Sequence, residues 1–240
     1  MAFYLIGLGL SINSITVEAL NILKTCDKVF VENYTVDFPY KIKDLEKNIE
    51  IKINELDRQK VEDESILKEA KREKVALLVY GDCLSATTHI QLITSCKSQK
   101  IPYEILHNTS ILTAVSNTGL QLYKFGKTTS MPNWKEHTNK PTSFVNYIKE
   151  NKSIGAHTLI LTDIGLNLKD AIMQLKESSK KENLKLDKII VLTNAGTKNQ
   201  KILYDTPDKI ENKEVNLPFC IIIPSKLNHV EEEALGVLKG

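Results

Sequence analysis

Short apolar runs alternate with amphipathic segments along the first half of the chain. The runs predict strands at residues 2–8, 28–32, 49–53, 75–80 and 103–106. Between them, apolar residues at helical spacing predict helices, for example in the segment that carries Ile15, Ala19, Ile22 and Leu23. Strands that alternate with helices in this way are typical of a mostly parallel sheet.

The second half begins near Ser110 and has a different pattern. Three strongly apolar runs predict strands at residues 158–162, 189–193 and 219–223, and a helix rich in Lys and Glu is expected over about 168–181. The segment with Pro132, Trp134 and Pro141 is predicted to be an exposed excursion. A length of 240 residues suits one large domain or two smaller ones, and we expect two α/β domains, at residues 1–108 and 109–240.

The clearest candidate for a ligand site follows the apolar run that ends at Tyr80. Gly81 permits a tight turn, and Asp82 places a carboxylate at the end of this strand. A helix is expected over residues 85–98, with three hydroxyl groups available to cap it, those of Ser85, Thr87 and Thr88. Ligands of open α/β sheets bind at the carboxyl ends of the strands. Ordinary turn and cap chemistry explains the same residues, so the loop by itself leaves both interpretations open.

Composition and charge argue against two classes of function for this chain: nucleic-acid binding and membrane association. The net charge is +2, and the cationic residues are almost all Lys, since Arg58 and Arg72 are the only arginines. Bidentate recognition of phosphates or guanines is therefore not expected, and neither is nucleic-acid binding. The N-terminus is interpreted as a first strand rather than a signal peptide, and no apolar run approaches the ~20 residues of a membrane span. No membrane association is expected.

Cysteines and histidines give little sign of reactive chemistry. The four cysteines have no CxxC spacing and form no ligand cluster with the five histidines, so no metal site is expected. Unpaired thiols favour a reducing, cytoplasmic location. Cys83 is interpreted as a small side chain in a tight turn. Three histidines are interpreted as packing or capping residues rather than general bases, namely His89, His107 and His157.

The glycines near the N-terminus follow the first predicted strand. Gly7 and Gly9 match the start of a dinucleotide fingerprint, but Ile12 stands where its third glycine would fall. A nicotinamide or flavin site is therefore rejected, although the two glycines still allow a ligand to approach the backbone closely. The sequence contains neither a GxxxxGK[ST] phosphate loop nor a GxSxG nucleophile elbow.

Several stretches resemble one family, in order along nearly the whole chain. Residues 4–10 (YLIGLGL) are similar to the first strand and loop of the tetrapyrrole-methylase-like methyltransferases. Residues 81–89 (GDCLSATTH) resemble the GDPLxATTH loop of the diphthine synthases in that superfamily, with Cys83 where the family usually has Pro. The resemblance continues through residues 107–111, 119–127 (GLQLYKFGK, the most distinctive run), 157–164, 194–196 and 223–227. Residues 225–228 (SKLN) replace the usual Gly-Lys-Leu-His.

This resemblance implies a fold, a cofactor and a substrate. The fold would be two α/β domains with a cleft between them that binds S-adenosylmethionine (SAM), in a homodimer. The substrate would be translation elongation factor 2, at a histidine that carries a 3-amino-3-carboxypropyl group. Three N-methylations of the amino group would give diphthine and S-adenosylhomocysteine. A compact chain favours three methyl groups over the four of the eukaryotic type, whose fourth methyl is an ester.

Two other functions stay open at this stage. One is a methyltransferase of the same superfamily that acts on a corrinoid precursor or another small molecule, against which the run at residues 119–127 argues. The other is a non-catalytic protein that keeps the fold and binds a partner.

The resemblance also implies which residues contact the donor. Carried over by position, they are Leu10, Asp82, Ser85, Ser110, Ile111, Thr162, Ala195 and Phe219. All eight fall at predicted strand ends or in the adjacent turns, which is where a ligand of such a sheet binds. Because a sulfonium methyl group is already activated, we expect positioning to dominate and no single catalytic base to be indispensable.

Overall fold

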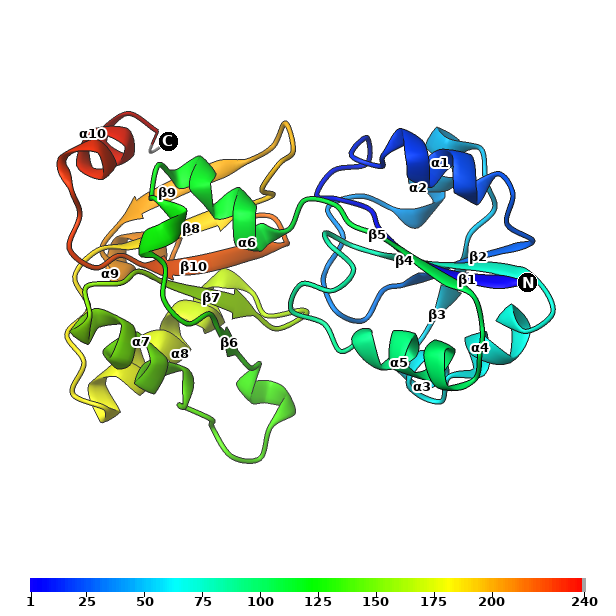
Figure 1. The fold of residues 1–240 in the computed structure, drawn as a ribbon. Coiled ribbons are helices and arrows are strands. Elements are labelled where there is room, and N and C mark those ends of the chain that lie inside the picture. The colour runs from blue at the N-terminus through cyan, green and yellow to red at the C-terminus, as the bar shows by residue number, and fades with distance from the viewer. Residues whose placement is uncertain (239–240) are drawn as a thin grey trace. The chain divides into compact units, whose positions relative to one another are not determined.

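The computed structural model describes residues 1–238, which form two compact units (Figure 1). Unit 1 comprises Met1–Leu112, and unit 2 begins at Thr113. Each unit is built on its own five-stranded sheet, so the chain has the mixed α/β architecture expected from its sequence.

The sheet of unit 1 is entirely parallel. Its strands are β1 (Ala2–Gly7), β2 (Lys28–Glu32), β3 (Asn54–Leu56), β4 (Lys74–Val79) and β5 (Tyr103–Leu106). They lie in the order β3-β2-β4-β1-β5. In a parallel sheet all strands end at the same edge, so the loops after β1, β4 and β5 meet there. We call this edge the carboxyl edge of unit 1.

Helices cover both faces of this sheet (Figure 1). On one face, α1 (Val17–Leu23) and α2 (Ile42–Ile49) pack on the strands through Leu23, Leu45 and neighbouring apolar residues. On the other face lie α3 (Arg58–Glu62), α4 (Ser65–Ala70) and α5 (Ile90–Ser98). With both faces covered, the central strand β4 is apolar and buried from Val75 to Val79, as is usual for parallel sheets.

The sheet of unit 2 is mixed. Its strands are β6 (Thr129–Met131), β7 (Thr158–Thr162), β8 (Ile189–Thr193), β9 (Lys201–Asp205) and β10 (Phe219–Ile223). They lie in the order β6-β7-β10-β8-β9, and β10 is antiparallel to both of its neighbours. The ends of β7 and β8 and the start of β10 therefore lie at one edge of this sheet.

Helices also pack on the sheet of unit 2. A large apolar cluster joins it to α7 (Phe144–Ser153), α8 (Leu168–Lys181) and α9 (Pro207–Ile210). Figure 1 shows α10 (His229–Leu238) on the opposite side of the sheet from α7 and α8. Trp134 packs in the short 3₁₀ helix Trp134–Glu136 and is 8% exposed, so this part of the predicted excursion is not exposed.

Several predicted elements are confirmed with the same bounds, among them β2, β5, β7, β8, β10 and α8. Two are shifted. The strand predicted at residues 49–53 forms later, as β3, because Ile49 ends α2 and buries there with Leu45. The helix predicted over residues 85–98 begins only at Ile90, because Ala86 takes a left-handed backbone conformation, with φ +59°. Strand β9 and helix α9 were not predicted.

None of the helices in residues 1–238 combines the length and apolar character that a membrane crossing requires.

Candidate active site

Two glycine loops lie together at the carboxyl edge of unit 1. Gly9 and Gly81 exchange reciprocal backbone hydrogen bonds, with N···O distances of 2.9 and 3.0 Å. Both have positive φ, +71° and +74°, which glycine adopts without strain. A Cβ atom added to Gly7 would lie 2.7 Å from the carbonyl oxygen of Gly81, so the close approach depends on glycine there too. The Tyr80 hydroxyl donates to the carbonyl oxygen of Leu10 at 3.0 Å and fixes the first loop further.

Asp82 accepts four hydrogen bonds at this edge. Its Oδ1 accepts from the backbone N–H of Leu84 and from the hydroxyl of Ser85, both at 3.0 Å. Its Oδ2 accepts from Nδ1 of His107 at 2.8 Å and from the backbone N–H of Asn108 at 3.1 Å. Burial alone would raise the pKa of the Asp82 carboxyl, but these hydrogen bonds outweigh burial and lower the pKa below its ordinary value. The group is therefore an ionised carboxylate with its acceptor positions occupied.

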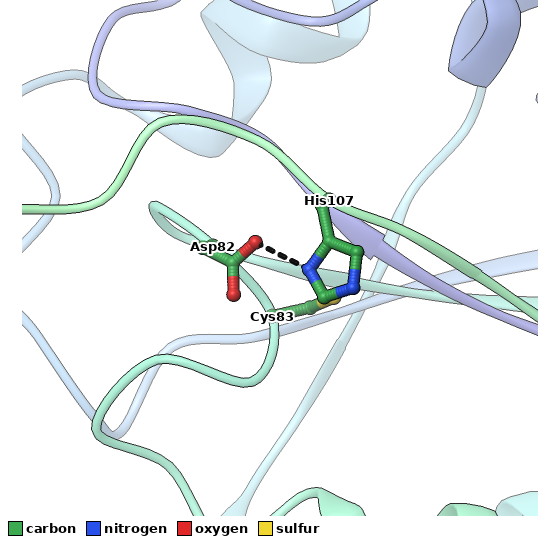
Figure 2. Close-up of side chains that lie close together, drawn as sticks. All are labelled: Asp82, Cys83 and His107. Atoms are coloured by element: carbon green, nitrogen blue, oxygen red, sulfur yellow. Dashed lines mark hydrogen bonds and ion pairs between the residues drawn. The ribbon is translucent and has the colours of Figure 1, made fainter. Parts of the chain in front are cut away.

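His107 lies in the segment after β5 and reaches across to Asp82 (Figure 2). Its side chain is 65% exposed, so it is not the packing residue that the sequence suggested. Because a carboxylate can only accept, Nδ1 carries the hydrogen of this bond. In the neutral imidazole the unprotonated nitrogen is then Nε2, for which the described residues of unit 1 offer no hydrogen-bond partner.

Cys83 lies beneath this pair (Figure 2) and is fully buried. Its thiol points toward the carbonyl oxygens of Leu5 and Leu106, and burial raises its pKa to about 12. The nearest ligand atoms of Asp82, Cys83 and His107 lie within 4.8 Å of one another. A protonated thiol and a carboxylate with four donors nevertheless make a poor cation site.

Asn108 holds the segment after β5 against the first loop. Its Nδ2 donates to the carbonyl oxygens of Gly7 and Ser14, at 3.1 and 3.0 Å. Its Oδ1 accepts from the N–H of Thr109 at 2.8 Å. The next residue, Ser110, is buried, and its hydroxyl accepts from the N–H of Leu112 at 3.1 Å. The polar run at residues 107–110 was a signal for this role, although the sequence did not show where its side chains point.

The residues expected to contact a donor fall into two groups. Five lie at the carboxyl edge of unit 1: Leu10, Asp82, Ser85, Ser110 and Ile111. A Cβ atom on Gly81 would come within 3.8 Å of the Leu10 side chain and 4.0 Å of Ser110 Cα, so Leu10 and Ser110 both lie next to Gly81. Ser85, Thr87 and Thr88 do not cap α5. Instead, the Ser85 hydroxyl donates to Asp82, and the Thr87 hydroxyl donates to the carbonyl oxygen of Cys83.

The other three, Thr162, Ala195 and Phe219, lie at one edge of the sheet of unit 2. The Thr162 hydroxyl donates to the carbonyl oxygen of Phe219 at 2.6 Å. Phe219 also pairs with the last residue of β8, two positions before Ala195. The structure therefore gathers each group within its own unit.

A second polar cluster, in unit 2, was not predicted. The Glu231 carboxylate is fully buried and is paired with the Lys124 ammonium. Its Oε1 accepts from Nε2 of the buried His157 at 3.0 Å, and Nδ1 of His157 accepts from the N–H of Ser225 at 2.9 Å. His157 is therefore a neutral imidazole, in agreement with burial lowering its pKa. The cluster connects the distinctive run at residues 119–127 to α10, and it lies at the end of the sheet where β7 begins.

Comparisons with known proteins agree on one family. The sequence model of the family described as Tetrapyrrole (Corrin/Porphyrin) Methylases matches residues 2–210. The diphthine methyl ester synthases of Homo sapiens and Saccharomyces cerevisiae are 44% and 46% identical over 164 and 169 residues. These matches cover 67% of this chain but only 57% and 55% of the relatives, so the chain spans little more than half the length of these relatives.

Two further similarities extend over the whole chain. The diphthine synthase of Methanococcus maripaludis is 34% identical in an alignment of 248 positions that covers 97% of this chain and 96% of that protein. A crystal structure of a diphthine synthase superposes with a TM-score of 0.91 at 29% identity, covering 100% of this chain and 96% of the other. Sequence and fold therefore agree, and the chain belongs to the tetrapyrrole methylase family and, within it, to the diphthine synthases.

Proposed function

We propose that the chain is a SAM-dependent methyltransferase that makes diphthine on translation elongation factor 2. It would transfer three methyl groups to the amino group of a 3-amino-3-carboxypropyl histidine. The observation that carries the proposal is the 34% identity to an archaeal diphthine synthase over 97% of the chain. The polar carboxyl edge of unit 1 supports it, since small ligands of parallel sheets bind at such edges.

We propose that SAM contacts the eight residues named from the sequence. Those of unit 1 suit an adenosyl sulfonium, because Leu10 and Ile111 offer apolar contact while Ser85 and Ser110 offer hydroxyl groups. Gly81 is buried beside these residues and carries no side chain that would cover its backbone. The Asp82 carboxylate already accepts four hydrogen bonds, so it would support the donor chiefly by fixing the loop at residues 82–85.

SAM would supply an activated methyl group, which leaves positioning as the main task of the chain. A neutral amine must lie in line with the bond between sulfur and the methyl carbon, and ideal alignment is worth up to ~7–11 kcal/mol. The reference pKa of an α-amino group is ~7.7–8.0, so part of it is neutral near pH 7. Apolar side chains such as Leu10, Ile111 and Phe219 would increase the neutral fraction of the amine, because burial disfavours the charged form.

Mass spectrometry of elongation factor 2 tests the proposed activity. The factor, carrying its 3-amino-3-carboxypropyl histidine, is incubated with the full chain and SAM. Three methyl increments on that histidine, with release of S-adenosylhomocysteine, are expected. Transfer of radiolabelled methyl only to a corrinoid precursor would point instead to a small-molecule methyltransferase. SAM binding without transfer to either acceptor would indicate a non-catalytic binding protein.

Calorimetry with SAM tests the site at unit 1. Asp82→Ala should weaken SAM binding, because the loop at residues 82–85 and the segment at residues 107–108 lose their common acceptor. The control is Asp63→Ala, since Asp63 accepts only from Ser65 at an exposed turn between α3 and α4. Unchanged affinity in Asp82→Ala would remove Asp82 from the site.

The four-methyl activity is a second candidate, and one observation favours it. Identity to the eukaryotic methyl ester synthases reaches 44–46% over about two thirds of the chain, above the 34% shared with the archaeal diphthine synthase. The two activities differ in the fourth methyl, which is an ester. Mild alkali removes an ester methyl and leaves N-methyl groups in place. A fourth increment that alkali removes would therefore assign the methyl ester activity.

We further propose that the chain forms a homodimer and acts in the cytoplasm. All four cysteines are free, and Cys83, Cys96 and Cys220 are buried, which suits a reducing compartment. Light scattering after size exclusion tests the dimer, with a mass of twice 27.1 kDa expected.

A further inference from the structure

The pair formed by His107 and Asp82 gives unit 1 a basic nitrogen that is exposed to solvent. Nδ1 of His107 donates to the carboxylate at 2.8 Å, and in the neutral imidazole this bond leaves Nε2 as the unprotonated atom. The side chain is 65% exposed, so a substrate group can reach Nε2 from outside. The Asp82 carboxylate is only 9% exposed and already accepts from four donors. It therefore favours the imidazole tautomer with the hydrogen on Nδ1 and does not itself take a proton from the substrate.

The proposed function requires a proton acceptor. An amine enters N-methylation as an ammonium and ends as a trimethylammonium, so three protons leave the nitrogen in the course of three transfers. Each must be lost before the lone pair can attack the methyl group. A base held close to the amine can remove this proton at a pH below the pKa of the amine, where deprotonation by bulk solvent is inefficient.

Three other titratable groups near Asp82 do not fit that task. The Cys83 thiol is buried, and burial raises its pKa to about 12. His89 is buried, with Nδ1 3.3 Å from the carbonyl oxygen of Cys83. The Tyr80 hydroxyl donates to Leu10, and burial raises its pKa. Residues 8–16 and 108–112, the two segments that Asn108 joins, carry no acidic or basic side chain.

We propose that Nε2 of His107 is the general base of this methyl transfer and that Asp82 is its positioning residue. The inference rests on the proposed function. The substrate ammonium gives one N–H proton to Nε2 and keeps the lone pair. As that lone pair forms the new N–C bond, the C–S bond breaks and its electrons stay on sulfur, which leaves neutral S-adenosylhomocysteine. The imidazolium then returns its proton to solvent, and the cycle repeats until no N–H remains.

The pH dependence of single-turnover N-methylation tests this assignment, with His107→Gln compared with the wild type. At neutral pH the variant should be slower by about 100-fold, a value at the lower end for general base catalysis. The difference between the two rates should disappear as the pH rises above the pKa of the free substrate amine, because solvent then removes the proton unaided. The role is therefore helpful at neutral pH without being indispensable. A purely structural role would leave the ratio of the two rates independent of pH.

Three controls accompany the experiment. SAM affinity by calorimetry should be the same in His107→Gln and in the wild type. His137→Gln, which changes an exposed histidine of unit 2, should keep the wild-type rate at every pH. Asp82→Asn should reproduce the pH-dependent loss, because an amide hydrogen facing Nδ1 favours the tautomer with the proton on Nε2.

The outcomes separate the two proposals. A wild-type rate in His107→Gln, or a loss that does not change with pH, overturns the assignment of the base while the methyltransferase function stands. If the wild type transfers no methyl group to elongation factor 2, the proposed function fails and this inference fails with it. Ester methylation, where it occurs, should be unaffected in His107→Gln because a carboxylate has no proton to lose.

Discussion

Asp82 joins two segments that lie far apart in the sequence. Its two oxygens accept from the loop after β4 and from the segment after β5. Hydrogen bonds to a charged group contribute about 1.5–3 kcal/mol each, so this residue stabilises both segments together. Its place at the end of a strand was predictable from the apolar run before it. The identity of its donors was not, because they depend on which strands become neighbours.

The three histidines near this chemistry illustrate the same limit. The packing or capping interpretation fits His89 and His157, which are buried. It does not fit His107. Both His107 and His157 lie next to the end of a strand, but the side chain of His107 points outward into solvent. A single residue beside a strand does not reveal which way its side chain faces, since that is decided by the turn that follows.

Gly7→Ala tests the close approach of the glycine loops. The new Cβ would lie 2.7 Å from the carbonyl oxygen of Gly81, so the loops must separate. We expect a loss of about 1–3 kcal/mol of stability, as for other overpacked sites, together with weaker SAM binding. Urea denaturation and calorimetry measure the two effects. Gly236→Ala is the matched control, because its Cβ meets nothing within 4 Å in helix α10. Equal stability in the two variants would contradict the strain argument.

At the scale of elements, the boundary between a loop and a helix was the hardest feature to predict. Residues 85–89 have a composition that suits the first turn of a helix, but Ala86 is left-handed and α5 starts at Ile90. The hydrogen bonds of Ser85 and Thr87 to Asp82 and Cys83 compete with helix formation. By contrast, β7, β8 and β10 are apolar runs with clear ends, and their bounds were predicted correctly.

The run at residues 119–127 is held to α10 by a buried ion pair, and Glu231→Gln tests its contribution. The change leaves the Lys124 ammonium without its partner, and breaking a buried pair in this way costs about 3–5 kcal/mol. Trp134 is the only tryptophan and lies in unit 2, so its fluorescence during urea denaturation reports on this unit. Glu232→Gln changes the exposed neighbouring residue and should leave the free energy of unfolding nearly unchanged. A similar small effect in both variants would refute the role of the cluster.

Acid should remove the contribution of Glu231 in a defined range. Burial alone would raise its pKa, but the hydrogen bonds from Lys124, Asn228, Gln121 and His157 lower it from 4.5 to about 2. A carboxyl group with a lowered pKa in the folded state stabilises the fold fully above its unfolded pKa and loses this effect as the pH falls toward the folded value. The stability difference between the wild type and Glu231→Gln should therefore be constant above pH 4.5 and shrink below it. Denaturation series across this range measure it.

At the scale of the whole molecule, the two units have separate apolar cores. Unit 1 has one apolar cluster on each face of its sheet, and unit 2 has a large cluster under α7, α8 and α9. Two α/β units were predictable, because each half contains apolar runs typical of strands together with at least one predicted helix. The mixed sheet of unit 2 was not, because periodicity indicates that a run is a strand and does not indicate its direction.

Stabilisation by SAM tests the proposed contacts in both units. A ligand at 100 times its Kd stabilises the unit that it contacts by about 2.7 kcal/mol. If SAM contacts Thr162, Ala195 and Phe219 as well as the residues of unit 1, the Trp134 signal of unit 2 should shift to higher urea. Amide exchange of β1 and β4 should slow as well. S-adenosylhomocysteine serves as a second ligand, and ATP as a control for nonspecific binding. A shift confined to unit 1 would remove the three residues of unit 2 from the site.

The position of β1 in its sheet has a consequence for biosynthesis. This first strand lies between β4 and β5, so Phe3 to Ile6 wait for partners that are synthesised about 70 to 100 residues later. During synthesis this apolar strand therefore stays unpaired until β4 and β5 have been made, and such segments are the kind that chaperones protect. The hydrogen bond from Asn108 to the carbonyl oxygen of Gly7, at the end of this strand, can form only once residue 108 has been added.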